Sequence, residues 1–342
     1  MSPVLRTGII GAGAISGMHL PVLASMEGVK IACICDIIPE RAQSAAEAYG
    51  CEFMTDWEQM IARTDIDVIH VLTPHYLHAR MAIAALQHGK HVLVEKPMAS
   101  ELADARRMIM ESDSRPNQRL GIIFQNRFNP STVALKQIIE SGEYGAFIGA
   151  RASVTWHREA PYYTESGWRG KMATEGGGVL INQAIHTLDL LSYLGGPIKR
   201  VRGQVSTILL EDAIDVEDNA HAVMEYANGK TAVLHATNNY VTDAPIVLEV
   251  MLEKATYQLL GDKLLVLKDG IPTLVQEGKA PTVAEKAYWG AGHAAQLLNF
   301  YNSIRSDEPL AVNAREGYPG LNLVKAIYTS SATGSWVTLD EV

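Results

Sequence analysis

Short apolar runs alternate with helical patterns through the first third of the chain. Apolar runs at 5–10, 29–35, 68–72, 91–94 and 120–124 predict buried β-strands, and helical spacing predicts helices at 18–26, 57–62, 78–86 and, capped by Ser100, up to about 112. Repeated strand–helix units form a parallel, doubly wound sheet. The pattern therefore predicts an α/β domain over residues 1–125.

Strand patterns dominate the rest of the chain, after a predicted helix at 131–140 that ends at Gly142. Strands at 220–226 and 231–237 flank Asn228-Gly229, a preferred two-residue hairpin turn, and a second candidate hairpin joins 264–267 to 271–275. Local hairpins belong to antiparallel sheets. We therefore expect an α+β domain over residues 126–342 with a large open, mainly antiparallel sheet, whose apolar face needs helices or a second subunit to cover it.

Composition narrows the class of protein. A chain of 342 residues is long enough for two domains, and 47% hydrophobic and 20% charged residues are typical of a soluble globular protein. A net charge of -9 argues against nucleic acid or an anionic membrane as partner. No apolar run reaches the length of a membrane span, and no signal peptide is evident. Cys33 and Cys35 lie on a predicted strand as core residues, so the cytoplasm is the expected compartment.

A glycine-rich turn follows the first strand. Residues 11–16 read G-x-G-x-x-S, and the helix that follows would offer its N-terminal N–H groups to a pyrophosphate. The second strand ends in Asp36, at the distance where a carboxylate holds the adenosine ribose hydroxyls. Asp36 would repel a 2'-phosphate, so NAD is expected rather than NADP, although Arg41 lies nearby; a structural unit without ligand is the alternative. The cofactor residues predicted here are Gly11, Gly13, Ala14, Ile15, Ser16 and Asp36.

The strand at 91–94 runs into Glu95-Lys96-Pro97. Carboxyl ends of parallel strands face the ligand crevice, so Lys96 is expected to project into it. Pro97 fixes the chain direction after the lysine, through a cis or a trans bond. A surface Lys–Glu pair is the alternative interpretation.

Two histidines follow Thr73-Pro74 at the end of the preceding strand. His75 and His78 would suit a metal, but no nearby cysteine or carboxylate completes a ligand set at the usual spacing. No metal is expected.

A second polar segment lies in the antiparallel half. Three glycines at 176–178 precede a predicted helix at 179–194, and they would let the backbone approach another group closely. Asn182 and His186 are four residues apart and so adjacent on one helical face, with Asp189 one turn beyond. His186 is a candidate general base, and a structural histidine is the alternative. Other polar candidates for a hydroxyl-rich ligand, any of which would also suit the surface, are Arg127, His157, Tyr163, Lys171 and Tyr288.

Together these motifs resemble the glucose-fructose oxidoreductase and inositol dehydrogenase family. The resemblance spans essentially the whole chain and rests on the glycine turn with His19 after it, Thr73-Pro74 through His78, the run from Gly89 into Glu95-Lys96-Pro97, and residues 176–189. It implies a Rossmann domain, a C-terminal domain whose open sheet mediates homodimers or homotetramers, and reversible oxidation of a sugar or cyclitol hydroxyl.

The resemblance also implies roles for individual residues. Lys96 and His186 match the catalytic lysine and histidine, and Trp168 and Arg169 match positions that line the nicotinamide and substrate pocket. Many members carry aspartate where this chain has Asn182. The further residues expected at the cofactor are Thr73, Pro74, His78, Glu95 and Lys96, and those expected at the substrate are Lys96, Arg127, His157, Tyr163, Asn182, His186 and Tyr288.

These residues suggest one mechanism and leave two alternatives. His186 would take the hydroxyl proton while Lys96 stabilises the alkoxide, or the two roles would be exchanged, and Asn182 would orient by hydrogen bonding. An NADPH-dependent aldose or anhydroketose reductase is the second possibility. A non-catalytic NAD-binding redox sensor is the third.

Overall fold

The computed structural model describes residues 4–278, 292–306 and 308–341, which form two compact units. Unit 1 comprises Met1–Ile123 and His293–Tyr318, and unit 2 comprises Phe124–Gly292 and Pro319–Val342. The expected boundary at 125/126 lies two residues from the first change of unit. Residues 293–318, expected in the second domain, pack with the first.

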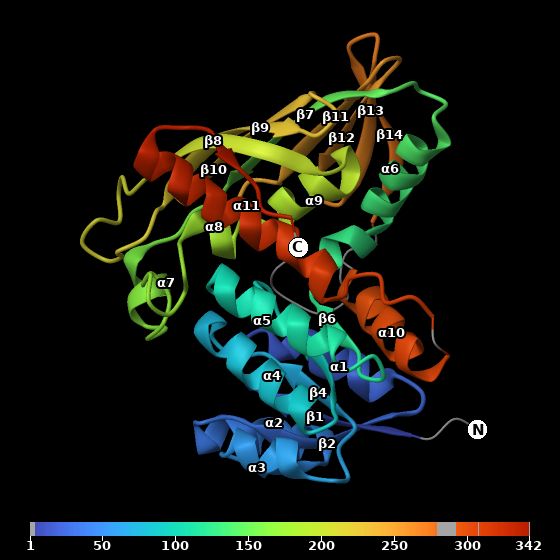
Figure 1. Cartoon of the computed structure of the whole chain (residues 1–342), viewed down its shortest axis with the longest axis vertical. Helices are drawn as coiled ribbons and strands as arrows, with labels where there is room; N and C mark the ends of the chain where they lie inside the picture. The colour runs from blue at the N-terminus through green and yellow to red at the C-terminus, as the bar shows by residue number, and fades with distance from the viewer. Residues whose placement is uncertain (1–3, 279–291, 307, 342) are drawn as a thin grey trace. The chain divides into compact units, whose positions relative to one another are not determined.

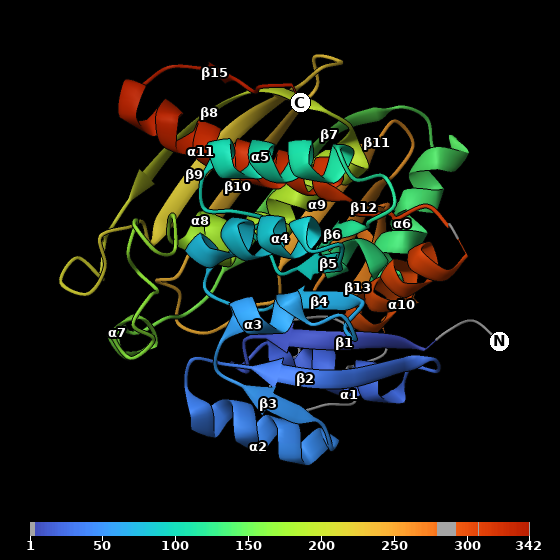
Figure 2. The same ribbon diagram turned by 60° about the horizontal axis from the view of Figure 1, so that its bottom comes forward.

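Unit 1 is built on a six-stranded, wholly parallel sheet in the order β3-β2-β1-β4-β5-β6 (Figure 2). The doubly wound prediction is confirmed, and the order reverses between β1 and β4, where such folds bind ligands at the carboxyl ends of the strands. The strands are β1 Leu5–Ile10, β2 Val29–Cys35, β3 Glu52–Met54, β4 Val68–Val71, β5 His91–Val94 and β6 Leu120–Ile122. The helices are α1 Ser16–Ser25, α2 Pro39–Tyr49, α3 Trp57–Ala62, η1 His75–Leu77, α4 His78–Gln87, α5 Leu102–Asp113 and α10 Gly292–Arg305.

Local signals set most of these boundaries. Asp56 caps α3 by accepting the N–H groups of Glu58 and Gln59, and Gly50 ends α2 in the left-handed conformation. The prediction that Ser100 caps α5 is wrong. The residue before the helix is Glu101, and it makes no side-chain capping bond.

The core of unit 1 draws on the C-terminal part of the chain. Leu297, Phe300 and Tyr301 of α10 are fully buried and pack with Ile9 of β1 and Leu93 of β5. This contribution to the first core explains why residues 293–318 group with the N-terminal unit.

Unit 2 contains a nine-stranded sheet in the order β14-β13-β12-β11-β7-β10-β9-β8-β15. The described pairs are antiparallel except that between β7 and β10, which confirms the mainly antiparallel prediction. The strands are β7 Phe147–Thr155, β8 Ile198–Ser206, β9 Asn219–Tyr226, β10 Thr231–Thr237, β11 Val247–Leu252, β12 Thr256–Leu260, β13 Lys263–Lys268, β14 Ile271–Glu277 and β15 Val337–Thr338.

Both predicted hairpins are present, with different turns. Asp269 and Gly270 have positive φ of 54° and 77°, as a two-residue primed turn requires. The turn at Asn228-Gly229 is not the two-residue type expected. Tyr226 pairs with Lys230 across a three-residue loop, and only its last residue, Gly229, has positive φ.

Helices cover one face of this sheet. Figure 1 shows α9 and α11 on the same side of it, where alternate residues of β9 and β10 are buried. The helices are η2 Gln125–Phe128, α6 Pro130–Ser141, α7 Ala160–Thr164, α8 Val179–Asn182, α9 Ile185–Gly195 and α11 Ala314–Thr333, which begins in unit 1. These helices of the chain thus cover the apolar face of the sheet.

None of the described helices is long and apolar enough to cross a membrane.

Candidate functional site

The glycine turn of unit 1 is shaped by its neighbours. Gly11 has φ 105°, and a Cβ there would lie 2.5 Å from the Leu72 carbonyl oxygen, so only glycine fits. A Cβ at Gly13 would meet nothing within 4 Å, which leaves open space above the backbone. Ser16, in place of a third glycine, donates its hydroxyl to the Gly13 carbonyl at 2.7 Å and begins α1.

This turn fits a dinucleotide pyrophosphate. Within the described part of the chain, the N–H groups of Gly13, Ala14 and Ile15 donate to no protein acceptor. Backbone N–H groups at a helix N-terminus favour an anion, and the open space at Gly13 lets one approach.

Asp36 lies directly after β2, beside the glycine turn. Its Oδ2 accepts the Ala12 N–H at 2.8 Å and its Oδ1 accepts the Ile38 N–H at 2.9 Å. The carboxylate is therefore held at the carboxyl edge of the sheet, as expected of an acceptor for ribose hydroxyls.

The loop after β4 is tied to the loop after β5 by His78. This buried ring places Nε2 2.7 Å from the Thr73 carbonyl oxygen and Nδ1 2.7 Å from the Pro97 carbonyl oxygen. Burial lowers the pKa of His78, although both carbonyl contacts and the Glu95 charge oppose this. Its ring nitrogens thus join two loops of the ligand edge, and its expected contact with the cofactor stays a prediction.

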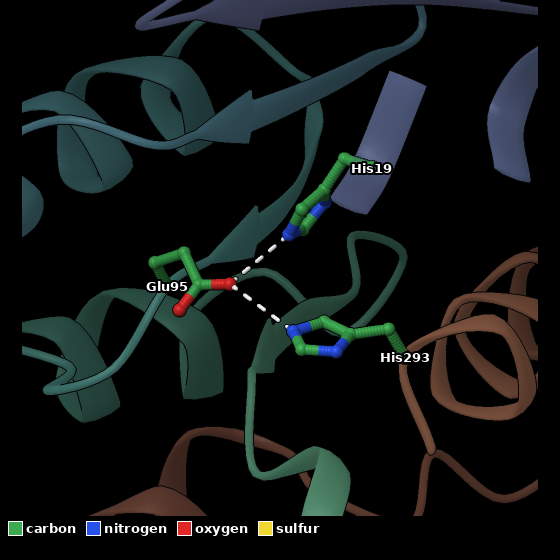
Figure 3. Close-up of side chains that lie close together, drawn as sticks. All are labelled: His19, Glu95 and His293. Carbon is green, nitrogen blue, oxygen red and sulfur yellow. Dashed lines mark hydrogen bonds and ion pairs between the residues drawn. The ribbon is translucent and has the colours of Figure 1, made fainter. Parts of the chain in front are cut away.

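Glu95-Lys96-Pro97 follows β5 as predicted, and the Lys96–Pro97 peptide is cis. The interpretation as a surface Lys–Glu pair is wrong, because Glu95 is only 5% exposed. Its Oε1 lies 3.0 Å from His19 Nε2 and 3.9 Å from His293 Nε2 (Figure 3). Its Oε2 accepts the backbone N–H of Lys96 at 3.2 Å. Direct contact of Glu95 with the cofactor remains a prediction.

Sequence reasoning missed the histidines that surround Glu95. His19 comes from α1 and His293 from α10, so their separation of 274 positions hides the group. His19 appeared only as part of a motif. No local pattern would have signalled His293.

In unit 2 the predicted continuous helix at 179–194 is interrupted. α8 ends at Asn182 and α9 begins at Ile185, because the Val179 carbonyl accepts N–H groups from both Gln183 and Ala184, at 3.1 and 2.8 Å. This wider turn breaks the regular ladder. Asn182 and His186 therefore do not lie on one continuous helix.

The glycines before α8 lie close to other residues of unit 2. A Cβ at Gly177 would lie 1.9 Å from the Tyr328 hydroxyl, and one at Gly178 would lie 1.9 Å from the Glu217 carbonyl oxygen. The group that the backbone approaches is thus in unit 2, and the glycines need no ligand to explain them.

Asn182 is anchored by a buried carboxylate. Its Nδ2 donates to Glu175 Oε1 at 2.5 Å and to the Tyr162 hydroxyl at 3.3 Å. The Tyr162 ring in turn lies 4.6 Å from the Arg169 guanidinium, which also lies 5.0 Å from the Trp168 ring. The structure therefore brings together three residues predicted for the site, Trp168, Arg169 and Asn182.

His186 is half-buried on α9. Its ring contacts Phe124 edge-on, with centroids 5.7 Å apart. Asp189, one turn further along α9, accepts two hydrogen bonds from Arg127, of 2.8 and 2.7 Å.

Two residues predicted to contact the substrate, Arg127 and Tyr163, are buried within unit 2. Arg127 is buried in its pair with Asp189, with its guanidinium 4.8 Å from the Tyr193 ring. Tyr163 is 2% exposed and accepts a bond from Asn238, and burial raises its pKa. Their expected contact with substrate is a prediction that this packing does not favour.

The remaining substrate candidates are peripheral or undescribed. His157 is exposed, with Nδ1 2.7 Å from the Tyr240 carbonyl oxygen. Tyr288 lies outside the described residues.

The sheet of unit 1 and the residues at its carboxyl edge define the class of protein. A parallel sheet in this order, a glycine turn opening a helix at its carboxyl edge and a carboxylate after the neighbouring strand define a dinucleotide-binding Rossmann domain. Residues 5–121 match the model of an oxidoreductase family with an NAD-binding Rossmann fold, and residues 132–258 match the GFO/IDH/MocA C-terminal domain. The chain belongs to the GFO/IDH/MocA family of NAD-binding oxidoreductases, which confirms the resemblance.

Individual relatives agree with this assignment. The chain is 26% identical to levoglucosan dehydrogenase of Pseudarthrobacter phenanthrenivorans over 99% of both chains. It is 37% identical to inositol 2-dehydrogenase of Salmonella typhimurium over 41% of this chain and 43% of that one. Its structure resembles that of the WlbA dehydrogenase of Bordetella pertussis in complex with NADH and UDP-GlcNAcA, with TM-score 0.86, 29% identity and 99% coverage of both chains.

Proposed function

We propose that this protein transfers a hydride between NAD and a secondary hydroxyl or ketone of a sugar, sugar derivative or cyclitol. The observation that carries the proposal lies within unit 1. The glycine turn, Asp36 and Lys96 all follow strands at the carboxyl edge of one parallel sheet, where cofactor and reacting group meet in folds of this kind.

Each residue has a separate task. Bound NAD supplies the hydride acceptor. Gly13 and the N-terminus of α1 hold its pyrophosphate, and Asp36 selects a ribose without a 2'-phosphate. Lys96 stabilises the developing alkoxide by its charge, and His186 takes the hydroxyl proton as general base.

Asn182 exchanges no proton at ordinary pH. Its amide nitrogen is committed to Glu175, so its carbonyl oxygen is the group suited to orient a substrate hydroxyl. Glu175 therefore sets the direction in which that oxygen points.

The substrate class draws support from the relatives. Levoglucosan dehydrogenase and inositol 2-dehydrogenase carry in their names an anhydrosugar and a cyclitol, both rich in secondary hydroxyls. An NADPH-dependent reductase is disfavoured by the Asp36 carboxylate. A non-catalytic NAD sensor would have no need of Lys96 and His186.

The test is NADH formation from NAD with a panel of levoglucosan, inositols, glucosides and nucleotide sugars. We expect turnover with at least one, and none when Lys96→Met replaces the parent. If no compound supported NADH formation while NAD bound tightly, the sensor alternative would replace this proposal.

We also propose that the protein is a cytoplasmic homodimer or homotetramer joined through the open face of the unit 2 sheet. That face exposes Val223 and Val233 by 41% and 45% on neighbouring strands. Light scattering at micromolar concentration should give at least twice the chain mass. A monomer would mean that the helices of the chain suffice to cover the sheet.

A further inference from the structure

A chain of buried hydrogen bonds runs through unit 1 away from Glu95. His19 Nδ1 lies 3.1 Å from His70 Nδ1, His70 Nε2 lies 3.0 Å from the Tyr301 hydroxyl, and that hydroxyl lies 2.7 Å from Thr7 Oγ1. Each of these side chains is fully buried. The chain therefore joins the residue before Lys96 to the core of the sheet.

The charge at the start of this chain is fixed. Burial opposes ionisation of Glu95, but the hydrogen bond from His19 and the nearby charges of His19, His293 and Lys96 lower its pKa to about 2. Glu95 is therefore a carboxylate at neutral pH, and an ionised carboxylate only accepts hydrogen bonds. It follows that His19 Nε2 carries a proton and donates it to Glu95.

Two proton arrangements satisfy the remaining bonds. With His19 neutral, His70 Nδ1–H donates to His19, and the Tyr301 hydroxyl donates to His70. With His19 charged, every one of these bonds reverses and the chain runs toward Thr7. Burial holds the pKa of His70 well below its usual range, so His70 is neutral in both. In both arrangements His19 Nε2–H donates to Glu95.

The far end of the chain decides what it does. Thr7 is fully buried, so the chain ends in the core and offers no path for protons to solvent. The chain of hydrogen bonds instead holds the His19 ring in one orientation.

His19, Glu95 and His293 together have the composition of a metal site. However, His19 Nε2 and Glu95 Oε1 are at hydrogen-bond distance, and His19 Nδ1 is already in contact with His70.

Glu95 links the fixed orientation of His19 to Lys96. Its Oε2 accepts the Lys96 backbone N–H, and its charge interacts with that of the Lys96 side chain. A buried carboxylate at this point favours the ammonium form of Lys96 and fixes the start of its loop.

We propose that His19 is a positioning residue for Lys96, which it controls by holding Glu95 as an oriented, ionised carboxylate. This inference rests on the proposed role of Lys96. No step of the reaction passes through His19, so its loss weakens turnover without abolishing NAD binding.

Three variants test the inference in the full chain. His19→Leu removes the donor, His19→Gln restores an N–H donor on a side chain of similar reach, and Tyr301→Phe breaks the far end of the same buried chain. The readouts are kcat, the affinity for NAD, and the pH profile of kcat/KM.

For His19→Leu we expect kcat to fall about tenfold or more with little change in NAD affinity. The limb of the pH profile that depends on Lys96 should move to lower pH by about one unit, because a Glu95 carboxylate that has lost its donor and its fixed orientation favours the ammonium less. His19→Gln should restore both readouts toward the parent. Tyr301→Phe should lower the melting temperature and move the limb less than His19→Leu does, because the contact of His19 with Glu95 remains.

Each contrary outcome has a distinct meaning. An unmoved limb in His19→Leu, or a larger shift in Tyr301→Phe than in His19→Leu, overturns the positioning role. One equivalent of a divalent metal in the purified parent overturns it too, in favour of a metal site. Parental turnover by Lys96→Met would instead defeat the proposed function itself, so the two failures are separable.

Discussion

Replacing Asp36 by alanine should weaken the binding of NAD much more than the binding of NADP. Asp36 accepts two backbone hydrogen bonds, from Ala12 at 2.8 Å and from Ile38 at 2.9 Å, and is proposed to accept the ribose hydroxyls. A hydrogen bond to a charged group is worth about 1.5–3 kcal/mol, so NAD binding should weaken by roughly 10- to 150-fold. NADP binding should weaken little or improve, because the repulsion of its 2'-phosphate is removed.

The same substitution also perturbs the fold, and this effect needs a control. Two backbone N–H groups lose their carboxylate acceptor, which lowers the free energy of unfolding. Asp56→Ala is a matched change, because Asp56 also accepts two backbone N–H groups, those of Glu58 and Gln59, at the start of α3. It should lower stability by a similar amount and leave NAD affinity unchanged.

Calorimetric titration of both variants with NAD and NADP gives the answer. Equal weakening of the two cofactors by Asp36→Ala would refute the assignment of this carboxylate to the ribose. So would tighter binding of NADP than NAD by the unmodified protein.

Two further predictions concern stability. Asp189→Leu removes the carboxylate partner of the buried Arg127 and should cost about 3–5 kcal/mol in urea unfolding, most of which adding Arg127→Met should recover. Glu58→Gln, in an exposed pair with Arg80, should cost less than about 1 kcal/mol. A small loss in Asp189→Leu would contradict the structural role of the buried pair. Burial lowers the pKa of His293 to about 4, so the unfolded chain binds the extra proton and stability should fall as pH falls from about 6.5 toward 4. His293→Leu should reduce this slope in thermal melts at pH 7, 5.5 and 4, and an unchanged slope would count against the burial of a neutral ring.

The sequence predicted those features whose determinants are close together along the chain. The glycine turn, Asp36 and Lys96 each directly follow a strand, so a strand prediction was enough to place them at one edge of the sheet. The Asp269-Gly270 turn is local in the same sense.

Features built from distant segments escaped prediction. The hydrogen-bond chain behind Glu95 joins residues from Thr7 to Tyr301, and no periodicity relates such positions. The break between α8 and α9 was also missed. It arises because the Val179 carbonyl accepts the N–H groups of both Gln183 and Ala184, whereas the apolar spacing across 179–194 fits an unbroken helix.

The measurement that tests the central claim most directly is the initial rate of NADH production by Lys96→Met, His186→Ala, Asn182→Ala and Asn182→Asp on the substrate found in the panel. We predict that the first two bind NAD and melt like the parent, yet lose about 10²- to 10⁴-fold in turnover. Asn182→Ala should lose less, because Asn182 orients without exchanging protons. Asn182→Asp should also lose activity, because its carboxylate cannot donate to the buried Glu175 carboxylate. Parental rates in both Lys96→Met and His186→Ala would contradict the account and leave the family resemblance as evidence for the fold alone.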